Sequence, residues 1–216
     1  MVKYAFLLTC LSAGLLNGQP VEVGVKGAVS LTGTSPYDFW HDESKRYQVG
    51  PYLEVRLPSR FAIEVDALYQ RVGSSQSFRY GPAQVQIGSE PATSVQGVWF
   101  NRLRGNSWQF PILAKYYLRD QSAAWQPFVS LGPSIRRVGS YTDTNQLSVD
   151  QQRGAVSYNI HSEYTNWTVG GTAAAGVRWH KGRFAITPEF RFTRWAQNNG
   201  NNLSRNAAAI FLGFGF

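Results

Sequence analysis

Residues 184–193 read FAITPEFRFT, and this stretch decides the fold. One parity is apolar and the other is polar or small: Phe184, Ile186, Pro188, Phe190 and Phe192 stand against Thr187, Glu189, Arg191 and Thr193. Successive side chains of a β-strand point to opposite faces, so this period of two predicts a strand with one apolar and one polar face.

The same alternation recurs along the chain. It marks residues 21–31, 47–57, 61–69, 108–118, 125–135, 167–179 and 208–216. Together with the first stretch, these segments predict an all-β domain of eight strands.

The connections between these segments alternate in length. Three turns are short, at residues 58–60, 120–124 and 180–183, whereas the loops at 32–45, 72–106, 139–165 and 196–204 are longer. We expect residues 84–87, 97–100 and 155–160, which alternate inside the longest loops, to extend the strands as hairpins. Short turns on one side and longer loops on the other are typical of an antiparallel up-and-down barrel in a membrane.

The apolar parity distinguishes a membrane barrel from a soluble one. It is nearly free of charge, and Arg71, Arg137 and Arg194 appear only at the loop ends of their strands. Aromatic residues bracket the apolar runs, as Trp108 and Tyr116 do. Both features are typical of lipid-facing strands, so we predict an eight-stranded antiparallel up-and-down transmembrane β-barrel.

The opposite parity carries charges of both signs. These residues are Glu22, Lys26, Glu54, Arg56, Glu64, Asp66, Lys115, Arg136, Arg178, Glu189 and Arg191. Side chains fill so narrow a barrel, and an isolated buried charge is costly, so we expect a structural network of ion pairs. The alternative is a gated, narrow ion path.

The N-terminus predicts export. Lys3 precedes an apolar run from Tyr4 to Leu16, and small residues follow, so residues 1–18 are expected to be a secretory signal peptide and 19–216 the barrel domain. The only cysteine, Cys10, lies inside the signal. The barrel domain therefore has no disulfide and no cysteine-based metal site.

Composition argues against two further classes. The net charge is +8, but the basic residues are scattered singly, so we expect no nucleic-acid partner. After the signal, no stretch approaches the roughly eighteen apolar residues of a membrane-spanning helix.

The last strand carries the sharpest motif. It ends with Ile210, Leu212, Phe214 and Phe216 on one parity. With this strand and its eight-strand pattern, the chain resembles the small outer-membrane barrels of the OmpA and OmpX type, in the outer membrane protein β-barrel domain family. It departs from the family's usual signature at Phe211, where a glycine is common.

The resemblance implies a location and a role. The chain would lie in the outer membrane of a Gram-negative bacterium, and the barrel-assembly machinery would recognise its last strand. The even strand number puts both termini on the short-turn, periplasmic side. The implied role is structural, adhesive or envelope-interacting, through long extracellular loops and a filled polar interior.

No residue pattern predicts catalysis, and we expect no cofactor and no metal. His161, Ser162 and Glu163 are consecutive, and neighbours on a strand point to alternate faces, so they cannot form a triad. The run at residues 41–43 is expected to be a solvated loop. Two alternatives stay open, a membrane-embedded lipid- or peptide-modifying enzyme and a soluble lipocalin-like ligand-binding barrel.

Four arginines are candidate contacts for lipopolysaccharide phosphates, which the guanidinium fork suits. They are Arg71, Arg79, Arg102 and Arg104, near one rim of the predicted barrel. The alternative is ordinary solvation of the loops. The expected partners are therefore outer-membrane lipid and lipopolysaccharide, the assembly machinery, and a surface partner reached through the loops.

Overall fold

The computed structural model describes residues 21–33, 41–85, 93–120, 122–149, 155–162, 166–196 and 204–216. Its strands are β1 (Val21–Ser30), β2 (His41–Asp42), β3 (Tyr47–Arg56), β4 (Phe61–Asp66), β5 (Leu68–Val85), β6 (Thr93–Tyr117), β7 (Trp125–Val149), β8 (Ala155–Ser162), β9 (Asn166–Lys181), β10 (Phe184–Trp195) and β11 (Asn206–Gly215). None of the described residues forms a helix long and apolar enough to cross a membrane. The predicted signal peptide and its boundary lie outside the described residues.

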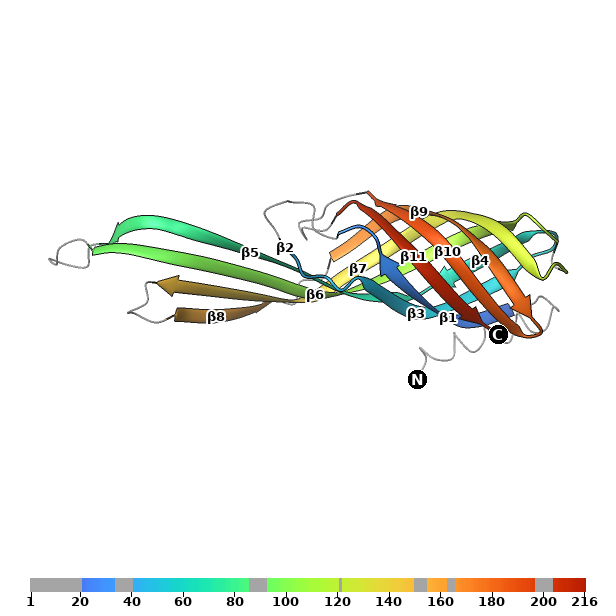
Figure 1. The fold of residues 1–216 in the computed structure, drawn as a ribbon, viewed down its shortest axis with the longest axis horizontal. Helices are drawn as coiled ribbons and strands as arrows, with labels where there is room; N and C mark the ends of the chain where they lie inside the picture. The colour runs from blue at the N-terminus through green and yellow to red at the C-terminus, as the bar shows by residue number, and fades with distance from the viewer. Residues whose placement is uncertain are drawn as a thin grey trace.

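The strands close into a barrel (Figure 1). β1 pairs with β3 on one side and with β11 on the other, and every pairing around the ring is antiparallel. β4 and β5 together make one strand of the barrel, which is interrupted at Ala67. The barrel therefore has eight strands among the described residues: β1, β3, β4 with β5, β6, β7, β9, β10 and β11. The predicted eight-stranded antiparallel barrel is confirmed.

Side chains alternate between the outside and the inside of this barrel. On β1, the Val25 residue is 52% exposed, whereas the neighbouring Lys26 is 0% exposed. The apolar parity of the other strands faces outward in the same way, and the charged parity faces inward. This orientation is the reverse of what the soluble ligand-binding alternative requires, because such a barrel encloses its apolar side chains.

Two belts of aromatic side chains surround the barrel. Near the short turns, the ring centroids of Phe61 and Tyr116 lie 5.1 Å apart. Near the other end, those of Tyr69 and Trp108 lie 5.3 Å apart. Along β6 the two belts are eight residues apart, a rise of about 20 Å once a tilt of roughly 40° is included. That rise suits the apolar band of an outer membrane.

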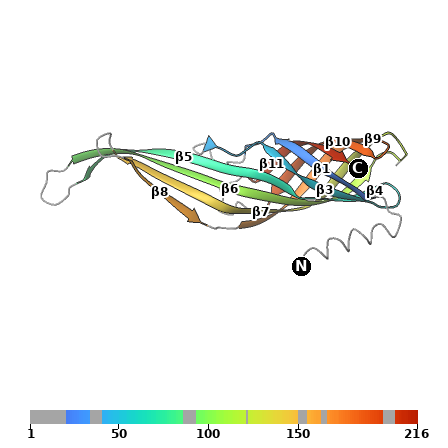
Figure 2. The ribbon, with the colours of Figure 1, turned by 90° about the horizontal axis from the view of Figure 1, so that it is seen from below.

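β5, β6 and β7 continue past one end of the barrel and form an antiparallel sheet there with β8 (Figures 1 and 2). This sheet is here called the extension. Ser77 pairs with Phe100, and farther along Trp99 pairs with Leu147 and Leu147 with Val156. Most of residues 72–106 and 139–165, predicted as loops, therefore belong to β5, β6, β7 and β8. The hairpin prediction is confirmed for residues 97–100 and 155–160, whereas residues 86–87 lie outside the described residues.

The alternation is weak in the extension because no lipid selects an apolar face there. Backbone pairing alone defines these strands, and polar residues occupy both parities, as in the run Gly73, Ser74, Ser75, Gln76 and Ser77. Hydrophobic period is therefore a poor guide beyond the membrane.

Candidate functional site

All eleven charged residues predicted for the interior are buried, and Arg56 is the most exposed of them at 9%. β1, β3, β4, β6, β7, β9 and β10 each supply at least one of these side chains on the inward parity. The alternation of each strand explains this placement, since lipid-facing positions exclude charge at the midplane.

Glu22 lies between two arginines near the short turns. Arg178 donates through its Nε at 2.9 Å and its Nη2 at 2.5 Å to Oε2 of Glu22, and Arg56 Nη2 lies 3.8 Å from the same oxygen. The Tyr52 hydroxyl donates to the other oxygen, Oε1, at 2.7 Å. Each oxygen of this carboxylate therefore has a donor.

Glu54 continues the network toward the centre of the barrel. Its carboxylate lies 3.4 Å from Arg56 Nε and accepts hydrogen bonds from Lys115 Nζ at 2.9 Å and from the Tyr117 hydroxyl at 2.7 Å. Lys115 also donates to Glu64. Lys115 thus links the carboxylates of two neighbouring strands, β3 and β4.

The densest part of the network surrounds Glu64. It accepts from Lys26 Nζ at 2.5 Å and from Arg191 Nη2 at 2.7 Å. Lys26 and Arg191 both contact Glu189 as well, at 3.2 Å and 2.5 Å respectively, and Arg191 donates to Asp66. Together with Lys115, three cations and three carboxylates therefore form one cluster across the lumen.

The joined network contains equal numbers of opposite charges. Its five basic members are Lys26, Arg56, Lys115, Arg178 and Arg191, and its five acidic members are Glu22, Glu54, Glu64, Asp66 and Glu189. Such pairing offsets the cost of burying charge, whereas removal of one partner leaves an uncompensated ion. The arrangement binds strands together and leaves little room for a substrate.

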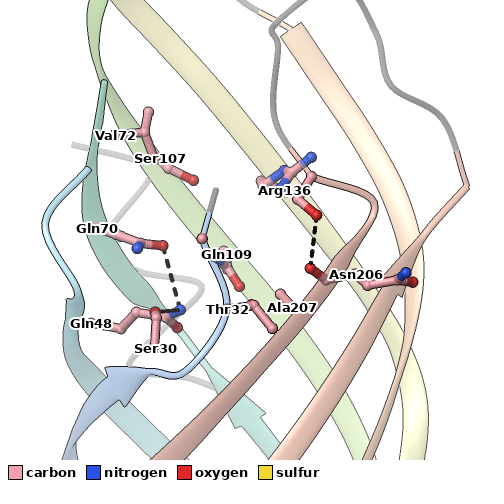
Figure 3. A pocket seen from close by; sticks show the side chains of 12 residues that line it. Ser30, Thr32, Gln48, Gln70, Val72, Ser107, Gln109, Arg136, Asn206 and Ala207 are labelled. Atoms are coloured by element: carbon pink, nitrogen blue, oxygen red, sulfur yellow. Dashed lines mark hydrogen bonds between the residues drawn. The ribbon is translucent and has the colours of Figure 1, made fainter. Parts of the chain in front are cut away.

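The lumen beyond this network is lined mainly by uncharged side chains, together with Arg136 (Figure 3). A cavity of about 20 Å³ there is bordered by Ser30, Gln48, Gln70 and Arg136, among others, and has room for a single water. Gln48 Nε2 donates to Ser30 Oγ at 3.2 Å and to Gln70 Oε1 at 3.4 Å. Arg136 lies at this level, with its guanidinium carbon 4.3 Å from the ring centroid of Trp195.

Three of the four predicted lipopolysaccharide contacts gather at the rim. Arg71, Arg102 and Arg104 line one open hollow together with Glu43. Arg102 Nε donates to Glu43 at 2.5 Å, and Arg104 Nη2 lies 3.5 Å from the same carboxylate. The structure does not bring Arg79 to this group, because it lies eight residues farther along β5, opposite Val98.

The prediction that residues 41–43 form a loop is wrong. His41 and Asp42 pair with Ser75 and Ser74 of β5, and the Glu43 backbone nitrogen donates to the Gly73 oxygen at 3.0 Å. Burial raises the pKa of Glu43, but hydrogen bonds and charge from Arg102 outweigh this effect, so the pKa is lowered. Residues 41–43 thus pair with the edge of β5.

The other chemically interesting residues lie apart. The candidate assembly residues Ile210, Leu212, Phe214 and Phe216 are all exposed on the outward face of the last strand or just beyond it. The three described histidines lie apart: His41 pairs with Ser75 near the extension, His161 pairs with Thr142 within it, and His180 pairs with Ala185 near a short turn. Glu163 lies outside the described residues. In the part of the chain described, no three His, Cys, Asp or Glu side chains could hold a metal ion.

The interior also uses neutral partners that alternation alone did not single out. The hydroxyls of Tyr52 and Tyr117 and the amide of Gln126 contact network residues. Their inward parity was the available signal, because a polar tip on a buried aromatic side chain needs a partner. Glu43 gave no such signal, since it lies in a region without clear period.

An apolar exterior, two aromatic belts and an ionic interior define a transmembrane β-barrel. Residues 17–194 match the family described as outer membrane protein beta-barrel domain, and the chain belongs to this family. The protein is therefore located in the bacterial outer membrane. A search of curated proteins finds no match.

Solved structures similar to this chain are small barrels. One is the N-terminal beta-barrel domain of Pseudomonas aeruginosa OprF, with 10% identity, 91% of this chain and 96% of that chain covered, and a TM-score of 0.46. Neisserial surface protein A has 12% identity, coverages of 92% and 97%, and a TM-score of 0.46. Ail of Yersinia pestis, in complex with the heparin analogue sucrose octasulfate, has 8% identity, coverages of 91% and 96%, and a TM-score of 0.36.

Proposed function

We propose that this protein is a structural and surface-interaction barrel of the outer membrane, without a catalytic role. The charge-balanced network of ten buried side chains carries this proposal. A lumen occupied by mutually paired side chains suits a stable platform better than a substrate pocket or an open pore. The alternative function of the same residues is a gated ion path. A measurement of bilayer conductance distinguishes this path from a closed structural barrel.

The proposed orientation puts both termini and the short turns in the periplasm and the extension outside the cell. The unequal ends of the barrel support it, because outer-membrane barrels have short periplasmic turns and long external segments. In this orientation the extension projects outward from the barrel toward a surface partner, which supports a role in adhesion or envelope contact.

The proposed partners are outer-membrane lipid with its lipopolysaccharide and, during insertion, the barrel-assembly machinery. The exposed arginines of the rim support the first, because a guanidinium fork matches a phosphate. Arg102 and Arg104 already contact Glu43, so a phosphate there has to compete with a carboxylate. The outward row of Ile210, Leu212, Phe214 and Phe216 supports the second partner.

A membrane-embedded enzyme needs His, Ser and an acid at one height of the barrel. Among the described residues, the interior carboxylates bind Lys and Arg. His41 and His161 belong to strands near or in the extension, and His180 lies near a short turn. The described part of the chain therefore gives this alternative no specific support.

A single substitution tests the membrane assignment. Leu131 is 67% exposed near the middle of the part of β7 that pairs with β9 in the barrel. Arginine there would be harmless in water but costs about 2 to 4 kcal/mol on a lipid face. We expect Leu131→Arg to lower the urea midpoint of the protein folded in lipid vesicles. The matched control is Leu118→Arg, because Leu118 is also exposed but follows the aromatic belt at a short turn.

Fractionation and gel mobility complete the test. The wild-type protein should appear in the outer-membrane fraction and migrate differently with and without boiling. Equal urea midpoints for the two variants, together with a soluble protein that shows no heat-dependent shift, would overturn the proposal.

A further inference from the structure

One row of outward-facing side chains crosses four strands at the end of the barrel near the extension. Tyr69 of β5 lies opposite Trp108 of β6, Trp108 opposite Arg137 of β7, and Arg137 opposite Trp167 of β9. Trp108, Arg137 and Trp167 are all exposed. A guanidinium therefore interrupts the aromatic belt where the lipid-facing surface meets the polar end of the barrel.

Beside this row the outer wall is hollowed. A cavity of about 110 Å³ lies between β6 and β7, bordered by Asn106, Trp108, Arg137 and Gly139. Asn106 and Gly139 face each other directly above the pair Trp108 and Arg137, and Gly139 contributes no side chain to fill the space. The register of the two strands shifts immediately beyond, after Asn106. Such bulges open the sheet and redirect the neighbouring side chains.

The polar groups at the hollow are donors. The Tyr69 hydroxyl donates to Oδ1 of Asn106 at 2.7 Å, which leaves the amide nitrogen of Asn106 as a donor. The Arg137 side chain borders the hollow, and its guanidinium carbon lies 5.8 Å from the ring centroid of Trp167 on the other side, on β9. No carboxylate borders the described hollow, in contrast to the rim, where Glu43 contacts Arg102.

We propose that this hollow binds a phosphate of an outer-leaflet glycolipid, with Arg137 as the main donor and Asn106 as the second. The depth favours a lipid over a soluble anion, because tryptophans of an interfacial belt lie at the level of lipid headgroups. Arg71, whose backbone pairs with Asn106, lines the neighbouring rim hollow instead, so Arg137 is the one cation that borders this described hollow. The inference rests on the proposed orientation, in which this end of the barrel faces the outer leaflet.

The test measures lipid retention by the full chain folded in detergent. Native mass spectrometry compares lipid A carrying its phosphates, lipid A stripped of phosphate, and inorganic phosphate. The variants are Arg137→Gln and Arg194→Gln. Arg194 is a matched control because it is an exposed arginine near the same end, but its cross-strand partners are Gly171 and Asn206 rather than tryptophans.

We expect the wild-type protein to retain phosphorylated lipid A better than the stripped form. Arg137→Gln should weaken this retention about tenfold, as expected for loss of a charge-assisted hydrogen bond, whereas Arg194→Gln should change it little. Arg137→Lys should restore only part of the retention, because it keeps the charge but loses the planar fork.

Three results would overturn the inference: equal retention of both lipid A forms, equal losses in the two glutamine variants, or inorganic phosphate binding as tightly as lipid A. The heat-dependent gel shift is recorded for every variant. If the shift persists while phosphate selectivity is absent, the lipid site is refuted and the membrane barrel is not.

Discussion

At the residue scale, Glu64 is the centre of the interior, because Lys26, Lys115 and Arg191 all donate to its carboxylate. Parity alone predicted that these charges face inward. It could not predict which of them meet, since pairs such as Glu22 and Arg178 are 156 residues apart and depend on how the barrel closes. Only the strand register supplies that information.

Replacing Glu64 with glutamine should be strongly destabilising. The change leaves three buried cations short of one carboxylate, and breaking a buried ion pair in this way costs about 3 to 5 kcal/mol. Urea unfolding in lipid vesicles, followed by tryptophan fluorescence, measures the loss. Glu43→Gln at the solvated rim is the control, with an expected cost under about 1 kcal/mol. Similar urea midpoints for both variants would contradict the role assigned to the network.

Glu43 itself should titrate below its ordinary pKa of 4.5, because its pKa is lowered in the folded protein. The stabilising contact with Arg102 is then present above pH 4.5 and is lost as the pH falls through the folded-state pKa. The carboxyl carbon shift of Glu43, followed by NMR against pH, gives the midpoint. In Arg102→Gln the midpoint should rise toward 4.5, and a wild-type midpoint at or above 4.5 would refute the contact.

At the element scale, close contacts between strands depend on glycine. A Cβ on Gly50 would clash with the carbonyl oxygen of Ala67, the residue that separates β4 from β5. The sequence predicted one continuous strand over residues 61–69, because the apolar period passes through Ala67 without a break. Gly50 and Pro51 on the neighbouring strand explain the interruption, and their effect appears only after the strands are paired.

Gly132 provides a test of such a contact. A Cβ at this position of β7 would lie 1.9 Å from the Ile112 carbonyl oxygen, so backbone must move in Gly132→Ala. We expect a loss of about 1 to 3 kcal/mol from overpacking. Gly171→Ala is the control, since nothing lies within 4 Å of a Cβ there. Chemical unfolding in vesicles checks both variants, and equal stability of the two would show that the strands separate without cost.

At the scale of the whole molecule, charge is divided between the inside and the ends. The ten network residues contribute no net charge, so the formal charge of +8 comes from the rest of the chain. The strand pattern, the closure and the inward charges were predictable because lipid imposes them. The extension was predictable only where short stretches alternate, as at residues 97–100 and 155–160, and the pairing of residues 41–43 with β5 was not predictable, because water imposes no comparable period.

The barrel should fold without the extension. Replacing residues 77–100 and 143–160 each by an Asn-Gly turn removes most of it at paired positions, since Gln76 lies opposite Asn101 and Thr142 opposite His161. The network and both aromatic belts remain. We expect the heat-dependent gel shift to persist, with loss of binding only to surface partners. Disappearance of the shift would mean that the extension helps to hold the barrel closed.

Closure between β1 and β11 has a consequence for biosynthesis. The first strand acquires its second neighbour only when the last one arrives, as the pairing of Gly24 with Gly215 illustrates. A nascent chain released from the ribosome before β11 would carry two unsatisfied edges, and such edges recruit other chains. Insertion therefore has to wait until translation has produced β11, and the polypeptide has to be kept unfolded until then.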